Sequence, residues 1–230
     1  MTLRDTSTAL HALDLHYRGN TDPQLLRKIL NYVSSHNTYL KKLEISVGGD
    51  SSLILSCVSS CRALRSLKLK VYSDGCGNHG KILFPKSLNF PALTNLDLYN
   101  FTFCANDNAD CSEPFIAFTN LKSLTIVWCT VRDAPILSIS SETLVNLTMF
   151  NNSSDFTKIQ LSTPNLSAFS IFGTPYQKLC GTGLSSVKQV DIQVYSYFHF
   201  DGLPLTLLNW LHDLDNVKSL TVASSTLKVP

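Results

Sequence analysis

A short apolar pattern repeats along this chain and limits its fold more than any other feature. Segments of the form apolar-x-x-apolar-x-apolar occur nine times, starting at Leu10, Leu40, Leu64, Leu93, Leu121, Leu144, Leu166, Val187 and Val217. All 27 apolar anchors are Leu, Ile, Val, Phe or Met, whereas only Ala12, Val145 and Ala168 are apolar among the 27 intervening positions. This alternation predicts that each segment ends in a short strand with one buried face.

The spacing of the segments predicts how these strands are arranged. Successive copies start 21 to 30 residues apart, which is the period of leucine-rich repeats. A lone strand with three anchors cannot bury its apolar face, but parallel copies stacked about 4.8 Å apart can. We therefore expect an α/β fold: a leucine-rich-repeat solenoid, a right-handed α/β horseshoe of about nine short parallel strands, as a single domain over residues 1–230.

Between the strands, some connecting segments predict helices and others predict loops. Residues 21–37 carry Pro23 in the first turn and an apolar stripe at helical spacing, and residues 204–214 have a similar pattern. A weaker helical pattern covers residues 51–61. Residues 76–91 and 104–118 are richer in Gly, Asn, Asp and Pro, so we expect irregular loops there.

Composition excludes several classes of partner. The net charge is only +2 and the basic residues form no block, which disfavours nucleic acid and anionic membranes as partners. Seven cysteines leave at least one thiol unpaired, which suits a reducing compartment. No secretory signal is found at Met1–Leu10, and no apolar run is long enough to span a bilayer. We expect a cytoplasmic or nuclear protein.

The residue types that carry catalysis or bind metals are scattered. The six histidines accompany neither a Gly-x-Ser-x-Gly nor a His-Glu-x-x-His motif. Cys57 and Cys61 are four residues apart and Cys76 precedes His79 by three, but a zinc site needs two such pairs with matched short spacings. Buried thiols packing as small hydrophobes are the better interpretation. We expect no enzyme activity, no cofactor and no metal site.

Aromatic residues at the ends of the strands suggest a binding surface. Strand alternation directs the residue after the last anchor outward, which we expect to place Tyr99, Val127, Phe150, Phe172 and Val194 on the concave face or its edge. Exposed Tyr and Phe on a rigid sheet often anchor protein partners. The alternative is that a neighbouring loop covers these side chains. The same alternation gives that face a polar flank. The candidate partner-binding residues are Glu44, Lys68, Lys70, Asp97, Tyr99, Phe150 and Phe172.

Longer stretches of the chain resemble a known family. Residues 163–175 (TPNLSAFSIFGTP), 183–194 and 207–222 resemble the repeats of plant F-box proteins with leucine-rich repeats and a C-terminal FBD segment, and residues 90–103 (FPALTNLDLYNFTF) are similar to the same repeat. The resemblance implies a protein-recognition module that selects substrates for a cullin ubiquitin ligase. We expect the F-box and the FBD segment to be missing from this sequence. A Skp1-type linker is therefore a partner only if an F-box exists upstream.

Two alternatives stay open alongside this interpretation. One is a truncated relative without an F-box, which binds an unknown protein but recruits no ligase. The other is an extracellular leucine-rich-repeat protein that binds a ligand or acts as an inhibitor. Five glycosylation patterns would suit an extracellular protein, although we interpret them as chance matches; they start at Asn100, Asn146, Asn151, Asn152 and Asn165.

Overall fold

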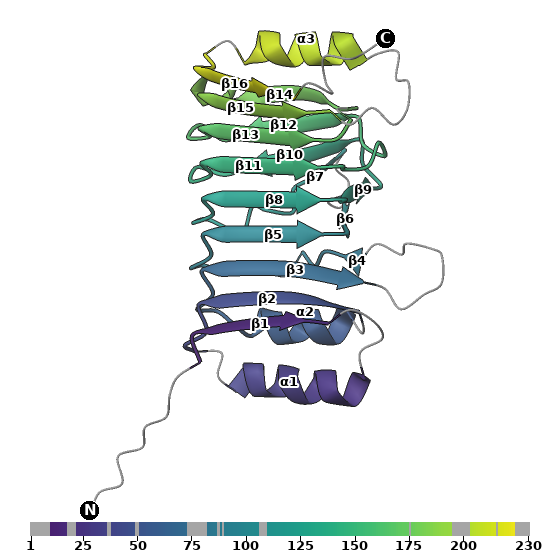
Figure 1. Ribbon diagram of the computed structural model, residues 1–230, viewed down its shortest axis with the longest axis vertical. Coiled ribbons are helices and arrows are strands. Elements are labelled where there is room, and N and C mark those ends of the chain that lie inside the picture. The colour runs from purple at the N-terminus through teal and green to yellow at the C-terminus, as the bar shows by residue number, and fades with distance from the viewer. Residues whose placement is uncertain are drawn as a thin grey trace, which may run out of the picture.

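Nine parallel strands form the largest sheet of the protein, here called the main sheet (Figure 1). The computed structural model describes residues 10–17, 22–35, 38–48, 51–72, 82–86, 88, 90–105, 110–174, 176–194, 203–214 and 216–223. In spatial order the strands are β1 (Ala12–His16), β2 (Lys42–Gly48), β3 (Ser66–Tyr72), β5 (Asn95–Tyr99), β8 (Ser123–Val127), β11 (Asn146–Phe150), β13 (Ala168–Phe172), β15 (Gln189–Gln193) and β16 (Ser219–Val222).

Each repeated segment contributes one of these strands, and its anchors stack on those of the neighbouring strands. Leu43, Leu67 and Leu96 are register partners on β2, β3 and β5, and all three are at most 1% exposed. The intervening polar residues point to the opposite side, the outer face of the main sheet. The predicted solenoid of stacked parallel strands is thus confirmed.

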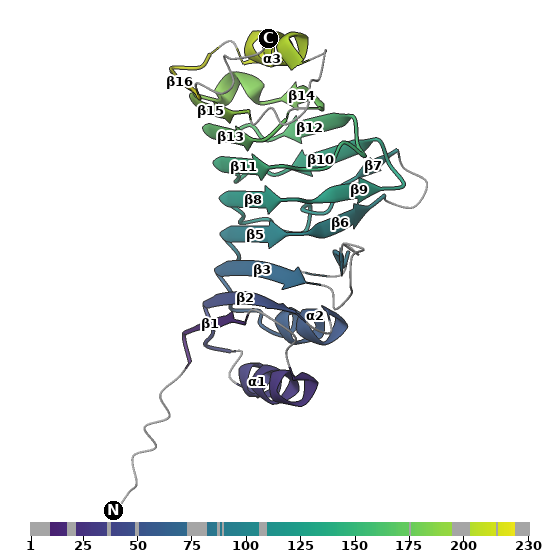
Figure 2. The same cartoon turned by 45° about the vertical axis from the view of Figure 1, so that its right-hand side comes forward.

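A second layer of strands lies behind the main sheet and returns the chain (Figure 2). One of its sheets contains β4 (Ile82–Leu83), β6 (Phe101–Cys104) and β9 (Thr130–Arg132). The other contains β7 (Cys111–Ser112), β10 (Ile136–Ser140), β12 (Lys158–Ser162) and β14 (Lys178–Thr182). The expectation of irregular loops at 76–91 and 104–118 was therefore incomplete, because β4 and β7 add short parallel pairings there.

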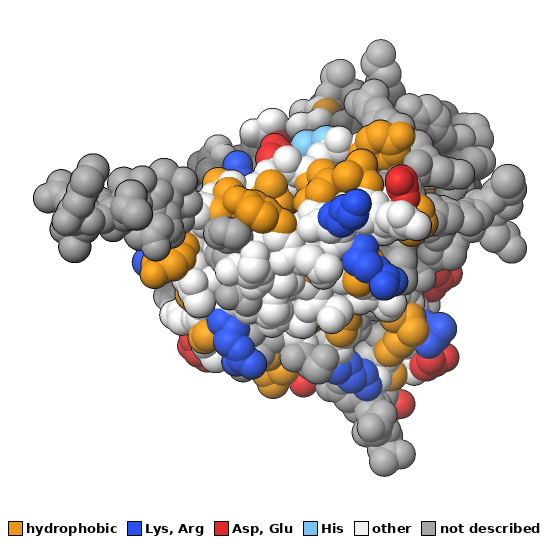
Figure 3. All heavy atoms as spheres, turned by 90° about the horizontal axis from the view of Figure 1, so that it is seen from below, with side chains coloured by type: hydrophobic (Ala, Val, Ile, Leu, Met, Phe, Trp, Pro, Cys, Tyr) orange, Lys and Arg blue, Asp and Glu red, His pale blue; other side chains and the backbone are white. Residues whose placement is uncertain are grey.

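Helices occur near the two ends of the stack, where they were predicted. They are α1 (Pro23–Ser35), α2 (Ser51–Ser59) and α3 (Leu203–Asp213), and one 3-10 turn, η1, covers Leu184–Ser186. Helix α1 buries Leu26, Leu30 and Val33. Viewed from the α1 end, hydrophobic side chains form separate patches among polar atoms and basic groups (Figure 3). Two large side chains of α1 are exposed, Leu25 at 53% and Tyr32 at 55%.

Phenylalanines fill the space between the two layers in the middle coils. The Phe84 ring makes edge contacts with Phe101 and Phe103, with centroids 5.7 Å away in both pairs. Phe90 and Phe118 stack at 6.1 Å. All five side chains are buried, and burying a ring of this size stabilises a fold by about 1.5–3 kcal/mol. Aromatic packing replaces the helices that pack against β1 and β2.

A left-handed turn joins the main sheet to the second layer in four consecutive coils. The residue after the strand has positive φ in each: Asn100 (64°), Trp128 (52°), Asn151 (44°) and Gly173 (109°). Each of these backbone N–H groups donates a hydrogen bond to the carbonyl oxygen of the last residue of the next strand in the main sheet, with N···O distances of 2.7–3.0 Å. The turn therefore redirects the chain while the hydrogen bonding between coils continues.

Two polar residues after the strands also satisfy backbone groups between coils. The side-chain Oδ1 of Asn152 accepts a hydrogen bond from the backbone N–H of Cys129 (3.0 Å). The side-chain Nδ2 of Asn152 donates to the backbone carbonyl of Ile126 (3.4 Å). The Cys129 thiol in turn approaches the Leu98 carbonyl. A short polar chain therefore crosses neighbouring coils.

A glycine in β14 provides a sharp test of the close spacing between second-layer strands. Gly181 has φ +134°, and a Cβ there would lie 1.8 Å from the Leu161 carbonyl oxygen. Gly181→Ala is expected to lower the free energy of unfolding by about 2 kcal/mol or more, measured by urea denaturation. Lys178→Ala, at an exposed position of the same strand, is the matched control. An unchanged Gly181→Ala midpoint would contradict this packing.

Candidate binding surface

The outer face brings all seven candidate residues into two adjacent rows. Register pairs Glu44 with Lys68 and Lys68 with Asp97 in the first row. The second row contains Lys70, Tyr99, Val127, Phe150 and Phe172, on consecutive strands of the main sheet. Strand alternation therefore placed these side chains on a common face.

Three aromatic side chains on this face touch one another, and we call them the aromatic ridge: Trp128, Phe150 and Phe172. The Trp128 and Phe150 rings are perpendicular with centroids 6.1 Å apart. The Phe150 and Phe172 rings stack at 5.7 Å. Such pairs add about 0.5–1.5 kcal/mol beyond the area they bury. The contacts hold three large rings in a fixed arrangement that is still partly open to solvent.

Trp128 is the member of the ridge that alternation alone did not place. Its left-handed backbone is sterically unfavourable for a bulky residue, yet its side chain is 42% exposed. Strained residues of this kind cluster at functional sites. The sequence did carry a signal, because the equivalent positions hold Asn100, Asn151 and Gly173, the residue types that tolerate positive φ.

Two of the positions expected on this face need correction. Val194 is fully buried, and the register partner of Phe172 is Gln193, which is the residue that follows the last anchor. Val127 lies in the row but is only 7% exposed, so it contributes little open surface. At the Lys70 end, the row also continues through Ser46 to His16.

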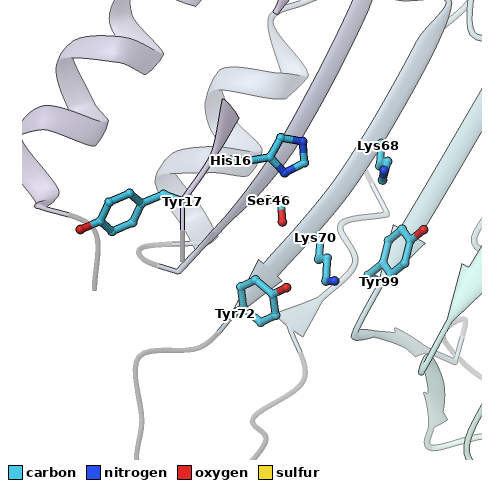
Figure 4. A pocket seen from close by; sticks show the side chains of 7 residues that line it. All are labelled: His16, Tyr17, Ser46, Lys68, Lys70, Tyr72 and Tyr99. Atoms are coloured by element: carbon cyan, nitrogen blue, oxygen red, sulfur yellow. The ribbon is translucent and has the colours of Figure 1, made fainter. Parts of the chain in front are cut away.

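A shallow pocket of about 340 Å³ opens at that end of the row (Figure 4). Its lining residues come from β1, β2, β3 and β5 or follow β1 directly: His16, Tyr17, Ser46, Lys68, Lys70, Tyr72 and Tyr99. The Lys70 ammonium lies over two of the rings, 5.5 Å from the Tyr72 centroid and 5.4 Å from that of Tyr99. These cation–π contacts hold the charge at the pocket.

Ion pairs engage the other charged groups beside the pocket. Glu44 pairs with Lys68, and His16 Nε2 lies 2.6 Å from Asp14 Oδ1 and 3.4 Å from Glu44 Oε1. The hydrogen bond from Lys68 holds the pKa of Glu44 below its ordinary value, and the same bond raises the pKa of Lys68. Both groups are therefore held in their charged forms.

The pKa of Asp97 is shifted in the opposite direction from that of Glu44. Burial raises the pKa of its carboxyl, and a hydrogen bond with the Thr125 side chain offsets part of that effect. It faces Lys68 across the register, so Lys68 has carboxylates on both sides. Lys70 has none: in the part of the chain that the structure describes, no carboxylate pairs with it.

One cluster among the described residues has the donor types of a metal site. The ligand atoms of Asp14, His16 and Glu44 lie within 4.8 Å of one another. However, the Glu44 carboxylate already contacts the Lys68 ammonium, whose charge opposes a cation at the same position. The geometry is better explained as an ion-pair network.

Among the described residues, the cysteines do not provide the two closely spaced ligand pairs that a zinc site needs. Cys57 and Cys61 are buried at the end of α2, and the Cys57 thiol donates to the Leu30 carbonyl at 3.3 Å. A hydrogen bond from Cys61 lowers the pKa of the Cys57 thiol. Cys76 and His79 lie outside the described residues.

The chain was compared with known protein families and with curated proteins. No known family model matches the chain, and no curated protein matches it. Among the described residues, no helix combines the length and the hydropathy of a membrane-crossing segment.

The Glu44–Lys68 pair predicts a pH-dependent contribution to stability. Because the folded pKa of Glu44 is lowered, its stabilisation is complete above the ordinary value of 4.5 and is lost as the pH falls through the folded value. Glu44→Gln is expected to lower the free energy of unfolding by about 1 kcal/mol at pH 7. In denaturation curves the difference from wild type should shrink below pH 4.5. Glu142→Gln, at an exposed carboxylate, is the control; a pH-independent difference would refute the explanation.

The Trp128 ring is exposed and available for binding, whereas its left-handed backbone is expected to lower the stability of the fold. Trp128→Asn introduces the residue found at the same turn in two neighbouring coils, which relieves the strain while removing the ring. We expect the free energy of unfolding to rise by up to about 1 kcal/mol, because the relief exceeds the loss of a half-exposed contact. Thermal and urea unfolding would measure it. A decrease of more than about 1 kcal/mol would show that the turn is not strained.

Proposed function

We propose that this chain is a protein-recognition module of the leucine-rich-repeat class, with the outer face of the main sheet as its binding surface. The repeat period, the nine stacked segments and the polar chain through Asn152 and Cys129 support that class. Helices occupy only some of the described connections between the strands of the main sheet. The finer expectation of an α/β horseshoe is therefore part of this proposal.

The aromatic ridge is the observation that carries the proposal. Large rings that are held rigidly and partly exposed lose little entropy on binding, and they bury much apolar area against a partner. A row of polar side chains borders the ridge on one side: Thr125, Thr148 and Ser170. An apolar centre with a polar border is the usual arrangement of a protein interface.

The biological role that we propose follows the resemblance of the repeats. The module would select a protein for ubiquitination, in the manner of the substrate-binding region of a plant F-box adaptor. Its recruitment to a ligase would require an F-box, through which a Skp1-type linker binds. The recognition role and the ligase role are separable, because the ridge belongs to the repeats themselves.

Removing the ridge tests the recognition role. Trp128→Ser, Phe150→Ser and Phe172→Ser are combined in one variant, and Ile116→Ser is the control because Ile116 is exposed in the connection between β7 and β8. Proteins captured from cell extract are quantified by mass spectrometry. We expect wild type and control to retain a common partner that the triple variant loses at least about tenfold, as for interface anchors.

Circular dichroism verifies that the triple variant is folded. A partner retained equally by a folded triple variant would refute the outer-face proposal. The same capture with the full-length gene product is probed for a Skp1-type linker. Its absence would remove the ligase role and leave the recognition role intact.

A further inference from the structure

One row of outward side chains connects the pocket with the aromatic ridge. It passes along register partners on consecutive strands: His16, Ser46, Lys70, Tyr99, Val127, Phe150 and Phe172. The row changes from polar and cationic at one end to aromatic at the other. Four strand spacings separate Lys70 from Phe172, which is about 19 Å at about 4.8 Å per strand.

Two hydrogen-bond donors at the polar end have no acceptor among the described residues. Lys70 contacts two aromatic faces but no carboxylate within the described residues. Ser46, its register partner on β2, has a hydroxyl without a hydrogen-bond partner in the same part of the chain. Both side chains lie at the pocket (Figure 4). An incoming oxygen anion could accept hydrogen bonds from both.

The surrounding charges favour a monovalent anion at this end. Lys68 and His16 also line the pocket, but both are paired with Glu44, and His16 is paired with Asp14 as well. Glu44 and Asp97 place two carboxylates in the adjacent row. A phosphate dianion would meet more repulsion there than a single carboxylate.

The aromatic end favours a bulky apolar group. Trp128, Phe150 and Phe172 present ring surface that is fixed by their mutual contacts. An extended peptide advances about 3.3 Å per residue, so about six residues cover the distance from Lys70 to Phe172. The row has the length and the polarity of a short linear segment lying across the strands.

We propose that this row binds a linear segment of the partner, with an Asp or Glu carboxylate at Lys70 and Ser46 and a bulky apolar side chain on the aromatic ridge, about six residues apart. This inference rests on the proposed function and specifies the chemistry of the partner. Ion pairing at Lys70 gives the segment its direction, and ring contacts at the other end give most of the buried area.

Peptide selection tests the proposal directly. A phage-displayed library of random dodecapeptides is selected on the immobilised full chain, on Lys70→Glu and on the control Lys122→Glu. Lys122 is exposed and precedes β8, outside the row. We expect wild type and control to enrich an acidic residue about four to seven positions from an aromatic or large aliphatic one. Lys70→Glu should lose the acidic preference and keep the apolar one.

A synthetic peptide then gives the magnitude. Replacing its Glu with Gln should weaken binding to the full chain about three- to tenfold in fluorescence anisotropy, and high salt should reduce that difference. The same replacement should not weaken binding to Lys70→Glu, because it removes repulsion between the peptide carboxylate and the new carboxylate at position 70.

The outcomes separate this inference from the proposed function. Selected peptides without an acidic preference, or with one that Lys70→Glu leaves unchanged, would overturn the inference. A selection that enriches no peptide would also overturn it. In either case, a partner that wild type captures and the ridge variant loses would still support the recognition role. If that capture fails as well, the proposed function fails with it.

Discussion

The stacking of apolar anchors in register between parallel coils is the interaction on which the rest of this structure depends. The anchors of each strand are covered by those of its neighbours, and the hydrogen bonds of the main sheet join different coils. A slip of one residue would turn every anchor to the solvent side, so the register is strongly determined. The same constraint fixes which side chains share a row on the outer face.

The left-handed turn after the strands connects this scaffold to the binding surface. In three of four consecutive coils it uses Asn or Gly, for which the backbone conformation is easily reached. Trp128 occupies the same turn at a steric disadvantage and makes its ring available beside Phe150. The packed second layer holds the turn in place, which allows one coil to carry a residue that the backbone conformation itself disfavours.

Ion pairs on the outer face engage several charged groups and leave Lys70 without a carboxylate partner among the described residues. Glu44 pairs with Lys68 and lies 3.4 Å from His16 Nε2, so the Lys68 ammonium has a carboxylate partner within the face. Lys70 is held by the rings of Tyr72 and Tyr99 instead, which do not neutralise it. Lys70 and the separate aromatic ridge would let the proposed surface discriminate between partners by charge as well as by apolar contact.

The sequence by itself determined the strands and the direction of their side chains, because the alternation of a strand is local and repeats nine times here. It also indicated α1, α2 and α3 from helical patterns. The tertiary structure alone decided which residues meet: the pocket joins side chains from several strands, and the second layer follows from turns that periodicity does not encode. Val194 lies two residues after the anchor Ile192, so alternation itself directs it to the core. Trp128 reached the ridge because the backbone changes direction at the end of the strand. Such changes depend on packing between coils.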